Sequence, residues 1–187
     1  MTGLDLAKDA LIEVSVHITD GDLNLLDEGL DVVIRPEPEP LEQMDDFVRN
    51  MHTVSGLLEE LPNGLTMEAA TDQVLSHIKR YVPEAGTALL AGNSVGNDRN
   101  FLLRDMPAVI DFLHYRIIDV STIKELCRRW YPAVFENAPE KTGNHRALGD
   151  IVDSLVELRY YRDSVMVATP GPGAAEAAAI AADISRN

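Results

Sequence analysis

The feature that most constrains the fold of this chain is an alternation of short strand patterns with segments of helical spacing. Apolar and polar residues alternate over residues 11–19, which predicts a half-buried strand with Glu13 on its polar, solvent-facing side, and residues 29–36 repeat this pattern until Pro36 stops it. Two short apolar runs follow much later, at 87–92 and 115–120, and both predict buried strands. Because helical patterns separate and follow these runs, the order predicts one α/β domain in which helices flank a mixed central sheet.

Residues that start or stop regular structure predict the individual elements. The turn residues 20–24 join the first two strands into a hairpin, and the spaced prolines after residue 35 predict an extended connector. A break is expected at Gly56, and Thr66 is positioned as a helix N-cap. The expected helices cover residues 41–61, 67–81, 101–106, 122–130 and 144–163. The expected inward faces are Ile12, Val14, Val16 and Ile18; Leu30, Val32 and Ile34; Ala70, Val74, Ile78 and Tyr81; and Ala147, Ile151, Leu155 and Leu158.

Charge limits the kinds of partner that the chain can have. The net charge of −15 argues against a protein that grips long nucleic acid, because such binding needs a basic surface. Residues 99–146 hold eight Lys/Arg against six Asp/Glu, a local charge of +2 that leaves −17 on the rest. A basic pocket for a short anionic ligand therefore stays open, beside the plainer interpretation of an acidic surface that aids solubility.

Other bulk features concern compartment and domain limits. No apolar run is long enough to cross a membrane, no secretory leader is recognisable, and the single Cys127 allows no internal disulfide, which together predict a cytoplasmic protein. Composition changes at Pro170, where an Ala-rich segment begins. We expect a domain over residues 1–165 and a tail rich in Ala, Pro and Gly over 166–187 that is disordered or marginally helical.

The stretch AGNSVGNDRNF (91–101) is the first candidate for chemistry. A strand ends there in a loop rich in Gly and Asn, and Asp98 stands at the start of a helix. Backbone N–H groups and the helix dipole at such a place suit an anion or a metal-bound phosphate. The stretch lacks the lysine and spacing of a P-loop, and the plainer alternative makes Asp98 an ordinary first-turn acid.

A second candidate is NHRALGD (144–150), which holds His145 and Asp150. Five residues along one helix turn these side chains about 140° apart, so they converge only if His145 precedes the helix. Gly143 and Asn144 favour that arrangement, which places a general base beside a metal-binding acid. The alternative is an unrelated surface histidine and surface aspartate.

Two further stretches hold polar or aromatic candidates. Asp119, Ser121 and Thr122 stand at the carboxyl end of strand 115–120, where α/β proteins build sites, although helix capping by Ser121 and a strand-end hydrogen bond by Asp119 are simpler alternatives. Phe47 and His52 could stack on bases, whereas helical spacing favours Phe47 as a core residue.

Taken together, these stretches resemble the oligoribonucleases, a family of DEDD-type 3′-to-5′ exonucleases with an RNase H-like fold. The resemblance runs from Met1 to about Asp163, and its motifs are MTGLDL, MDDFVRNMHTVSGL, AGNSVGNDRNFL, FLHYRIIDVSTIKELCRRW and HRALGDI. It implies an exoribonuclease that degrades oligoribonucleotides of about two to five residues to mononucleotides by hydrolysis with two divalent cations, Mg²⁺ or Mn²⁺. It also implies a homodimer.

The resemblance implies a role for each matching residue. Asp98 and Asp150 match metal-binding acids, and His145 matches the general base. Tyr115 matches a catalytic tyrosine that reaches the active site of the partner subunit. The residues that match substrate contacts, or that could stack on bases, are Leu4, Phe47, His52, Ser94, Arg116, Ser121 and Thr122.

One part of the family pattern is missing from the sequence. The first two acids of the family lie in an Asp-x-Glu motif directly before MTGLDL, and this sequence starts at Met1. We therefore expect an N-terminally truncated form that binds metals weakly and has little or no activity, because two lost acids remove transition-state stabilisation. The competing hypotheses are a catalytically dead binding protein of the same fold and a plain interaction domain.

Overall fold

The structure is a computed structural model that describes residues 1–141 and 146–185. Its strands form one antiparallel pair and one parallel pair, and no described strand joins the two. The antiparallel pair is β1 (Glu13–Val16) with β2 (Leu30–Val33), and the parallel pair is β3 (Leu89–Gly92) with β4 (His114–Asp119). The expected hairpin and the mixed strand directions of an α/β fold are confirmed.

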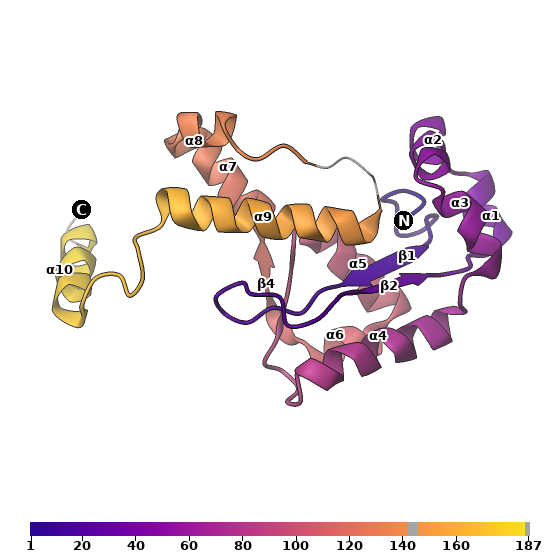
Figure 1. Ribbon diagram of the computed structural model, residues 1–187, viewed down its shortest axis with the longest axis horizontal. Coiled ribbons are helices and arrows are strands. Elements are labelled where there is room, and N and C mark those ends of the chain that lie inside the picture. The colour runs from indigo at the N-terminus through magenta and orange to yellow at the C-terminus, as the bar shows by residue number, and fades with distance from the viewer. Residues whose placement is uncertain (142–145, 186–187) are drawn as a thin grey trace.

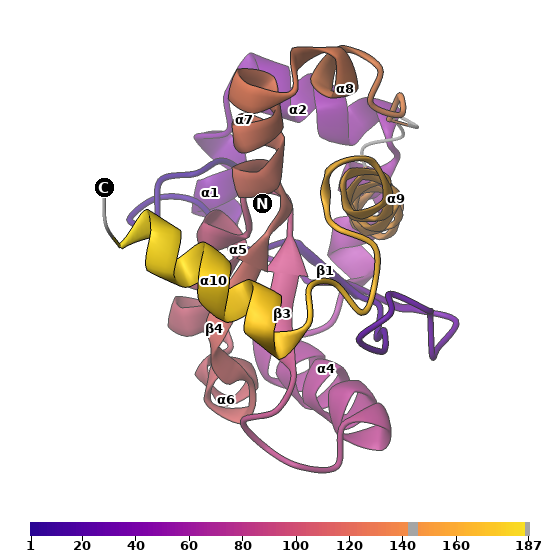
Figure 2. The same cartoon turned by 90° about the vertical axis from the view of Figure 1, so that its left-hand side faces the viewer.

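Helices surround these strands on several sides. Figure 1 shows α9 crossing over one side of the β1–β2 hairpin while α4 and α6 lie on the other side, and Figure 2 shows the same arrangement from the end. The helices are α1 (Pro38–Glu42), α2 (Asp46–Val54), α3 (Leu57–Glu60), the 3₁₀ turn η1 (Leu61–Asn63), α4 (Met67–Tyr81), α5 (Val95–Asp105), α6 (Pro107–Phe112), α7 (Val120–Trp130), α8 (Pro132–Glu136), α9 (Ala147–Val165) and α10 (Ala174–Ile184).

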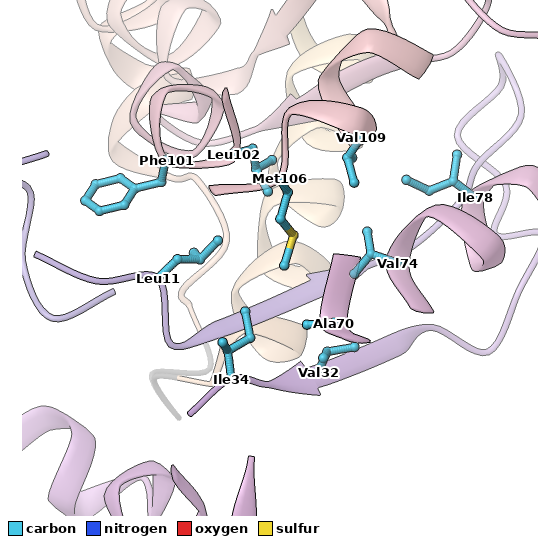
Figure 3. Close-up of a cluster of buried hydrophobic side chains, with 10 residues drawn as sticks. All are labelled: Leu11, Val32, Ile34, Ala70, Val74, Ile78, Phe101, Leu102, Met106 and Val109. Carbon is cyan, nitrogen blue, oxygen red and sulfur yellow. The ribbon is translucent and has the colours of Figure 1, made fainter. Parts of the chain in front are cut away.

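The main core lies between the hairpin and helices α4, α5 and α6. Figure 3 shows Met106 reaching from the α5–α6 junction toward Ala70 of α4, and both residues are fully buried. The cluster consists of Leu11, Val32, Ile34, Ala70, Val74, Ile78, Phe101, Leu102, Met106 and Val109. The predicted inward faces of β2 and α4 are therefore confirmed at their central positions.

Two local signals act as the sequence predicts. Gly56 adopts the left-handed conformation (φ +78°) between α2 and α3, which most residues adopt only with strain, so the helical run breaks there. The Thr66 hydroxyl accepts the Ala69 N–H at 3.2 Å and caps α4.

The prediction for the proline segment is wrong. Pro38 begins helix α1 instead of continuing an extended connector. Pro107 and Pro132 likewise begin α6 and α8, which the sequence reading missed because it took both prolines only as helix ends. Proline is favoured at the first helical position, since its fixed φ is helical and that position needs no N–H donor.

The burial of two strands and one helix face also differs from expectation. Strands β3 and β4 were expected to be buried, yet Leu89 is 41% exposed, Tyr115 is 72% exposed, and Ile117 and Ile118 are exposed as well. Conversely, Glu13 was expected on a solvent face of its strand and is only 8% exposed. The alternation of β1 identified the strand, but it did not reveal what packs on its polar face.

The last helix, α10, stands apart from the rest of the chain. Figure 1 shows an extended segment separating it from α9, and none of its residues is buried. Residues 174–184 are thus helical in the structure, while the division into a domain at 1–165 and a tail at 166–187 stays a prediction. Among the described residues, no helix is both long and apolar enough to cross a membrane.

Candidate active site

The carboxyl ends of β3 and β4 bring two loops into contact. Gly92 at the end of β3 lies opposite Asp119 at the end of β4. One carboxylate oxygen of Asp119 accepts the backbone N–H groups of Ser94, at 3.0 Å, and Ser121, at 2.9 Å. The Ser94 N–H also lies 2.8 Å from the Ser121 hydroxyl oxygen. The loop before α5 and the start of α7 are therefore fixed to each other.

These contacts test the two simpler alternatives, helix capping by Ser121 and a strand-end hydrogen bond by Asp119. Asp119, not Ser121, supplies the capping oxygen at the start of α7, so the capping role predicted for Ser121 is wrong. The predicted strand-end hydrogen bond of Asp119 is confirmed. The Ser121 hydroxyl instead donates to the Asn93 side-chain oxygen at 3.1 Å, and it lies 3.1 Å from the Ser94 hydroxyl.

Ser94 has a strained backbone at the start of α5. Its φ of +52° lies in the left-handed region, where a residue with a side chain costs on the order of 1 kcal/mol or more. The bonds from its N–H to Asp119 and Ser121 hold it there. Such strain concentrates at functional sites, which agrees with a substrate-binding loop in front of α5.

Asp98 lies one turn further along, in the first turn of α5. Burial raises the pKa of this carboxyl above its usual value, and the negative charge of Asp119 raises it further, while the amino group of Met1 acts in the opposite direction. The net result is an acid whose charged form is poorly stabilised by its surroundings. A positive charge close to Asp98 would stabilise its charged form.

Asp150 lies in the first turn of a different helix, α9, and its side chain is exposed. Residue 145, the predicted general base, lies outside the described residues. The structure therefore describes Asp98 and Asp150 as two acids on two helices, and it leaves the geometry of His145 as a prediction.

The carboxylates of the predicted metal-binding acids are chemically suited to a divalent cation, but too few of them gather in one place. Carboxylates are the ligands that Mg²⁺ and Mn²⁺ prefer, and Asp98 has the raised pKa described above. Within residues 1–141 and 146–185, however, no three side chains of His, Cys, Asp or Glu gather closely enough to hold a metal ion. The described residues therefore do not form a complete cation site, and the ligand roles of Asp98 and Asp150 stay predictions.

The residues predicted to contact bases divide into two groups. Leu4 is 67% exposed, and Phe47 on α2 is 79% exposed, so the core alternative for Phe47 is wrong. His52 is buried, and its Nε2–H donates to the Met1 carbonyl oxygen at 2.9 Å. This histidine holds the N-terminal segment, and its buried ring does not present the open face that base stacking requires. Any other contact of His52 with substrate stays a prediction.

Tyr115 and Arg116 project from β4. The Tyr115 ring stacks on His114 with a centroid separation of 4.5 Å, and the Arg116 guanidinium lies 5.5 Å from the centre of the same ring. Both side chains are exposed, and Thr122 on α7 is exposed too. The described contacts place Ser94 with Ser121 at the strand ends, and they do not connect Tyr115 to these residues.

The sequence reading missed a buried polar network behind the strand ends. The Glu157 carboxylate accepts the Asn93 amide N–H at 2.9 Å and forms an ion pair with Lys124 at 3.0 Å. Asn93 also donates to the Ser154 hydroxyl at 3.0 Å. The network joins the end of β3 to α7 and α9, so it connects the helix that carries Asp150 to the loop that leads to Asp98.

A signal for this network was present in the sequence of α9. Asp153, Glu157 and Tyr161 recur every four residues, and all three are buried together with Ser154 and Leu158. The predicted apolar face of this helix is correspondingly less buried, since Ala147, Ile151 and Leu155 are only partly covered.

Comparison with known proteins identifies the family of the chain. A family model described as an exonuclease of the RNase T type matches residues 1–158. The chain is 62% identical over 172 residues to an oligoribonuclease of Cutibacterium acnes, covering 92% of this chain and 85% of that protein. It is 59% identical over 182 residues to an oligoribonuclease of Streptomyces coelicolor, covering 97% and 91% of the two chains. An oligoribonuclease of Mycobacterium sp. (strain KMS) is 53% identical over 185 residues, covering 98% and 86%.

The fold and the family model define the class first, which is that of the exonucleases. Within this class, the chain belongs to the oligoribonuclease family. The expected family and the expected α/β exonuclease fold are thus confirmed.

Proposed function

We propose that this protein is a hydrolase that degrades short oligoribonucleotides from their 3′ end to mononucleotides. The observation that carries the proposal is the identity of 62% over 92% of this chain with a protein named oligoribonuclease. The strained Ser94, the raised pKa of Asp98 and the paired serine hydroxyls at the strand ends support a phosphate-processing site in this fold.

The reaction depends on divalent cations, and we propose two of them, Mg²⁺ or Mn²⁺, with Asp98 and Asp150 as protein ligands. When bound, such cations activate water and stabilise the leaving oxygen in phosphodiester hydrolysis. The protein contributes the rigid placement of the acids, because Asp98 is fixed in the first turn of α5 and Asp150 in the first turn of α9. His145 is proposed as the general base.

The substrate is a short RNA, and its contacts are proposed from exposure and chemistry. Leu4 and Phe47 expose apolar surface on which bases can lie, and base–aromatic stacking tolerates any base. The hydroxyls of Ser94 and Ser121 and the Arg116 guanidinium can bond phosphate oxygens. A substrate this short requires no long basic groove, so the net charge of −15 is compatible with it.

A homodimer is proposed from the exposed face of β4. Tyr115, Ile117 and Ile118 are all more than a third exposed, and Trp130 of the adjoining α7 is 66% exposed. Exposed large apolar side chains of this kind are typical of an interface. Tyr115 is then the residue that reaches the active site of the partner. Light scattering after gel filtration is expected to give twice the chain mass, and a monomer at micromolar concentration would contradict the dimer.

We also place this activity in the cytoplasm. The only cysteine, Cys127, is buried and unpaired, which fits a reducing compartment.

The direct test of function is hydrolysis of a 5′-labelled RNA dinucleotide with Mn²⁺. Release of labelled mononucleotide that depends on Mn²⁺ supports the proposed function, and Asp150→Asn is expected to abolish it. A protein that binds the dinucleotide and leaves it intact would support the binding-protein alternative.

A further inference from the structure

The start of helix α9 is held by side chains that belong to three other elements. Arg146 is the residue directly before the helix. Its Nε donates to one oxygen of Glu13 on β1 at 2.7 Å, and its two terminal nitrogens contact both oxygens of Glu60 on α3 at 2.7 and 3.2 Å. A further contact of 3.3 Å joins Arg146 to Asp31 on β2. One guanidinium thus connects β1, β2 and α3 to the beginning of α9.

Glu13 also completes the helix itself. The residue at the N-cap position, Arg146, provides no side-chain oxygen for the first N–H groups of α9. The second carboxylate oxygen of Glu13 accepts the Ala147 N–H at 3.1 Å instead. Since the first turn of a helix has N–H groups without internal partners, Glu13 acts as a cap supplied from a distant strand.

The contact between Glu13 and Arg146 is largely shielded from water. Glu13 is 8% exposed, and the side chain of Arg146 is 24% exposed, so neither can easily exchange its partner for water. A carboxylate that accepts one bond from the arginine fork and another from a helix N-terminus has a fixed orientation. Glu60 and Glu13 raise the pKa of Arg146, which remains a cation at every accessible pH.

The first turn that this contact holds carries Asp150, whose N–H donates to the Arg146 carbonyl oxygen at 3.0 Å. Any loosening of the contact changes where the Asp150 carboxylate stands. Errors of about 1 Å in such a position reduce catalytic rates by roughly 100-fold. We propose that Arg146 and Glu13 are positioning residues, which fix the start of α9 on the hairpin and on α3 and thereby place Asp150. This inference rests on the proposed function, because it assigns Asp150 its role as a metal ligand.

The test compares Arg146→Lys with a matched control, Arg129→Lys, in the 187-residue chain. Arg129 also pairs with a glutamate, Glu125, but on the exposed surface of α7. Lysine keeps the positive charge but lacks the planar guanidinium fork, so it can bind one of the three acids (Glu13, Glu60 and Asp31) and not all of them at once. Hydrogen exchange without metal and single-turnover cleavage of the RNA dinucleotide with Mn²⁺ are measured for each variant.

In Arg146→Lys, exchange of the amides of residues 147–151 is expected to accelerate by about tenfold or more, while exchange in α4 is unchanged. The saturating cleavage rate is expected to fall by about 10- to 100-fold, with the half-saturating RNA concentration within about threefold, because the substrate contacts lie elsewhere. Glu13→Gln is expected to show the same pattern to a smaller degree, since its amide oxygen can still accept the Ala147 N–H. Arg129→Lys is expected to change neither measurement.

Two results would overturn the inference. One is a cleavage rate within about twofold of the wild type in Arg146→Lys despite faster exchange in residues 147–151, because the contact then stabilises the helix without placing Asp150. The other is acceleration that spreads equally to α4, which indicates general destabilisation. If the wild type itself cleaves no RNA, the proposed function fails and the catalytic role of the contact fails with it, while the exchange data still decide whether Arg146 holds α9.

Discussion

Removal of the Glu157 carboxylate is expected to destabilise the junction of β3, α7 and α9. Glu157 is 5% exposed, and its carboxylate forms an ion pair with Lys124 at 3.0 Å. The carboxylate also accepts hydrogen bonds from the Asn93 amide at 2.9 Å and from the hydroxyl of the fully buried Tyr161 at 3.3 Å. Glu157→Ala leaves all three of these groups without the carboxylate. Burial would raise the pKa of Glu157, but Lys124 and then Asn93 outweigh burial and lower it, so the charged form is the one that the fold stabilises.

The size of the effect follows from these contacts. Breaking a buried ion pair costs about 3–5 kcal/mol, but the Lys124 side chain is 34% exposed and regains water, so a smaller share applies. The two hydrogen bonds from the neutral donors Asn93 and Tyr161 add about 1 kcal/mol each. We therefore expect Glu157→Ala to lower the free energy of unfolding by about 3 kcal/mol, which corresponds to a fall in Tm of roughly 6–12 °C for a chain of this size.

Urea unfolding followed by circular dichroism at pH 7.5 measures this effect. Glu125→Ala is the matched control, since Glu125 pairs with Arg128 and Arg129 on an exposed face of α7, and its unfolding midpoint is expected to stay at the wild-type value. The stability that Glu157 contributes is present above its unfolded-state pKa and is lost as the pH falls through its lower folded-state pKa, so the difference between wild type and Glu157→Ala should shrink below about pH 4. A loss below about 1 kcal/mol at pH 7.5 would refute the reasoning, because Lys124, Asn93 and Tyr161 would then have found other partners.

Three further predictions concern the hairpin and the substrate surface. Asp27→Ala is expected to destabilise the fold by about 3 kcal/mol, because the fully buried Asp27 carboxylate accepts N–H groups from two histidines and one backbone amide. Burial would raise the pKa of Asp27, but the two histidines outweigh burial and lower it. The loss of stability in thermal unfolding should therefore shrink below about pH 4. Gly29→Ala is expected to lower Tm by several degrees while Gly21→Ala does not, because Gly29 has φ +88° and an added methyl group would lie 2.6 Å from the His17 ring, whereas nothing lies near Gly21. Phe47→Ala is expected to weaken dinucleotide binding by about 1–3 kcal/mol in a fluorescence titration at unchanged Tm, and a lower Tm with unchanged binding would show instead that Phe47 is a packing residue.

Local sequence signals predicted the elements that depend only on neighbouring residues. Gly56 broke the helical run and Thr66 capped α4, because a left-handed glycine and a threonine hydroxyl act within a few residues of themselves. The hairpin was predictable for the same reason, since its turn and its two alternating strands are adjacent in the sequence.

Features that depend on distant residues were not predictable in this way. Glu13 reads as a solvent-facing strand residue until α9 brings Arg146 and the Ala147 N–H to it, more than 130 positions later. The apolar run of β4 predicts burial, and yet Tyr115, Ile117 and Ile118 are exposed, because burial depends on what packs against a strand and not on its own sequence. The roles predicted for the site residues come from the family resemblance. The structure adds that the Ser94 backbone is strained, that the Asp98 carboxyl is partly buried and that the Phe47 side chain is open to solvent.

The measurement that tests the central claim most directly is the product pattern of a 5′-labelled RNA pentanucleotide with Mn²⁺, followed over time on a sequencing gel. The account predicts that the label passes through products shortened one nucleotide at a time from the 3′ end, and that Asp98→Asn and Asp150→Asn each abolish this shortening. Labelled mononucleotide released at once, internal cut sites, or undiminished shortening in both variants would contradict a 3′-to-5′ exoribonuclease that relies on these two acids.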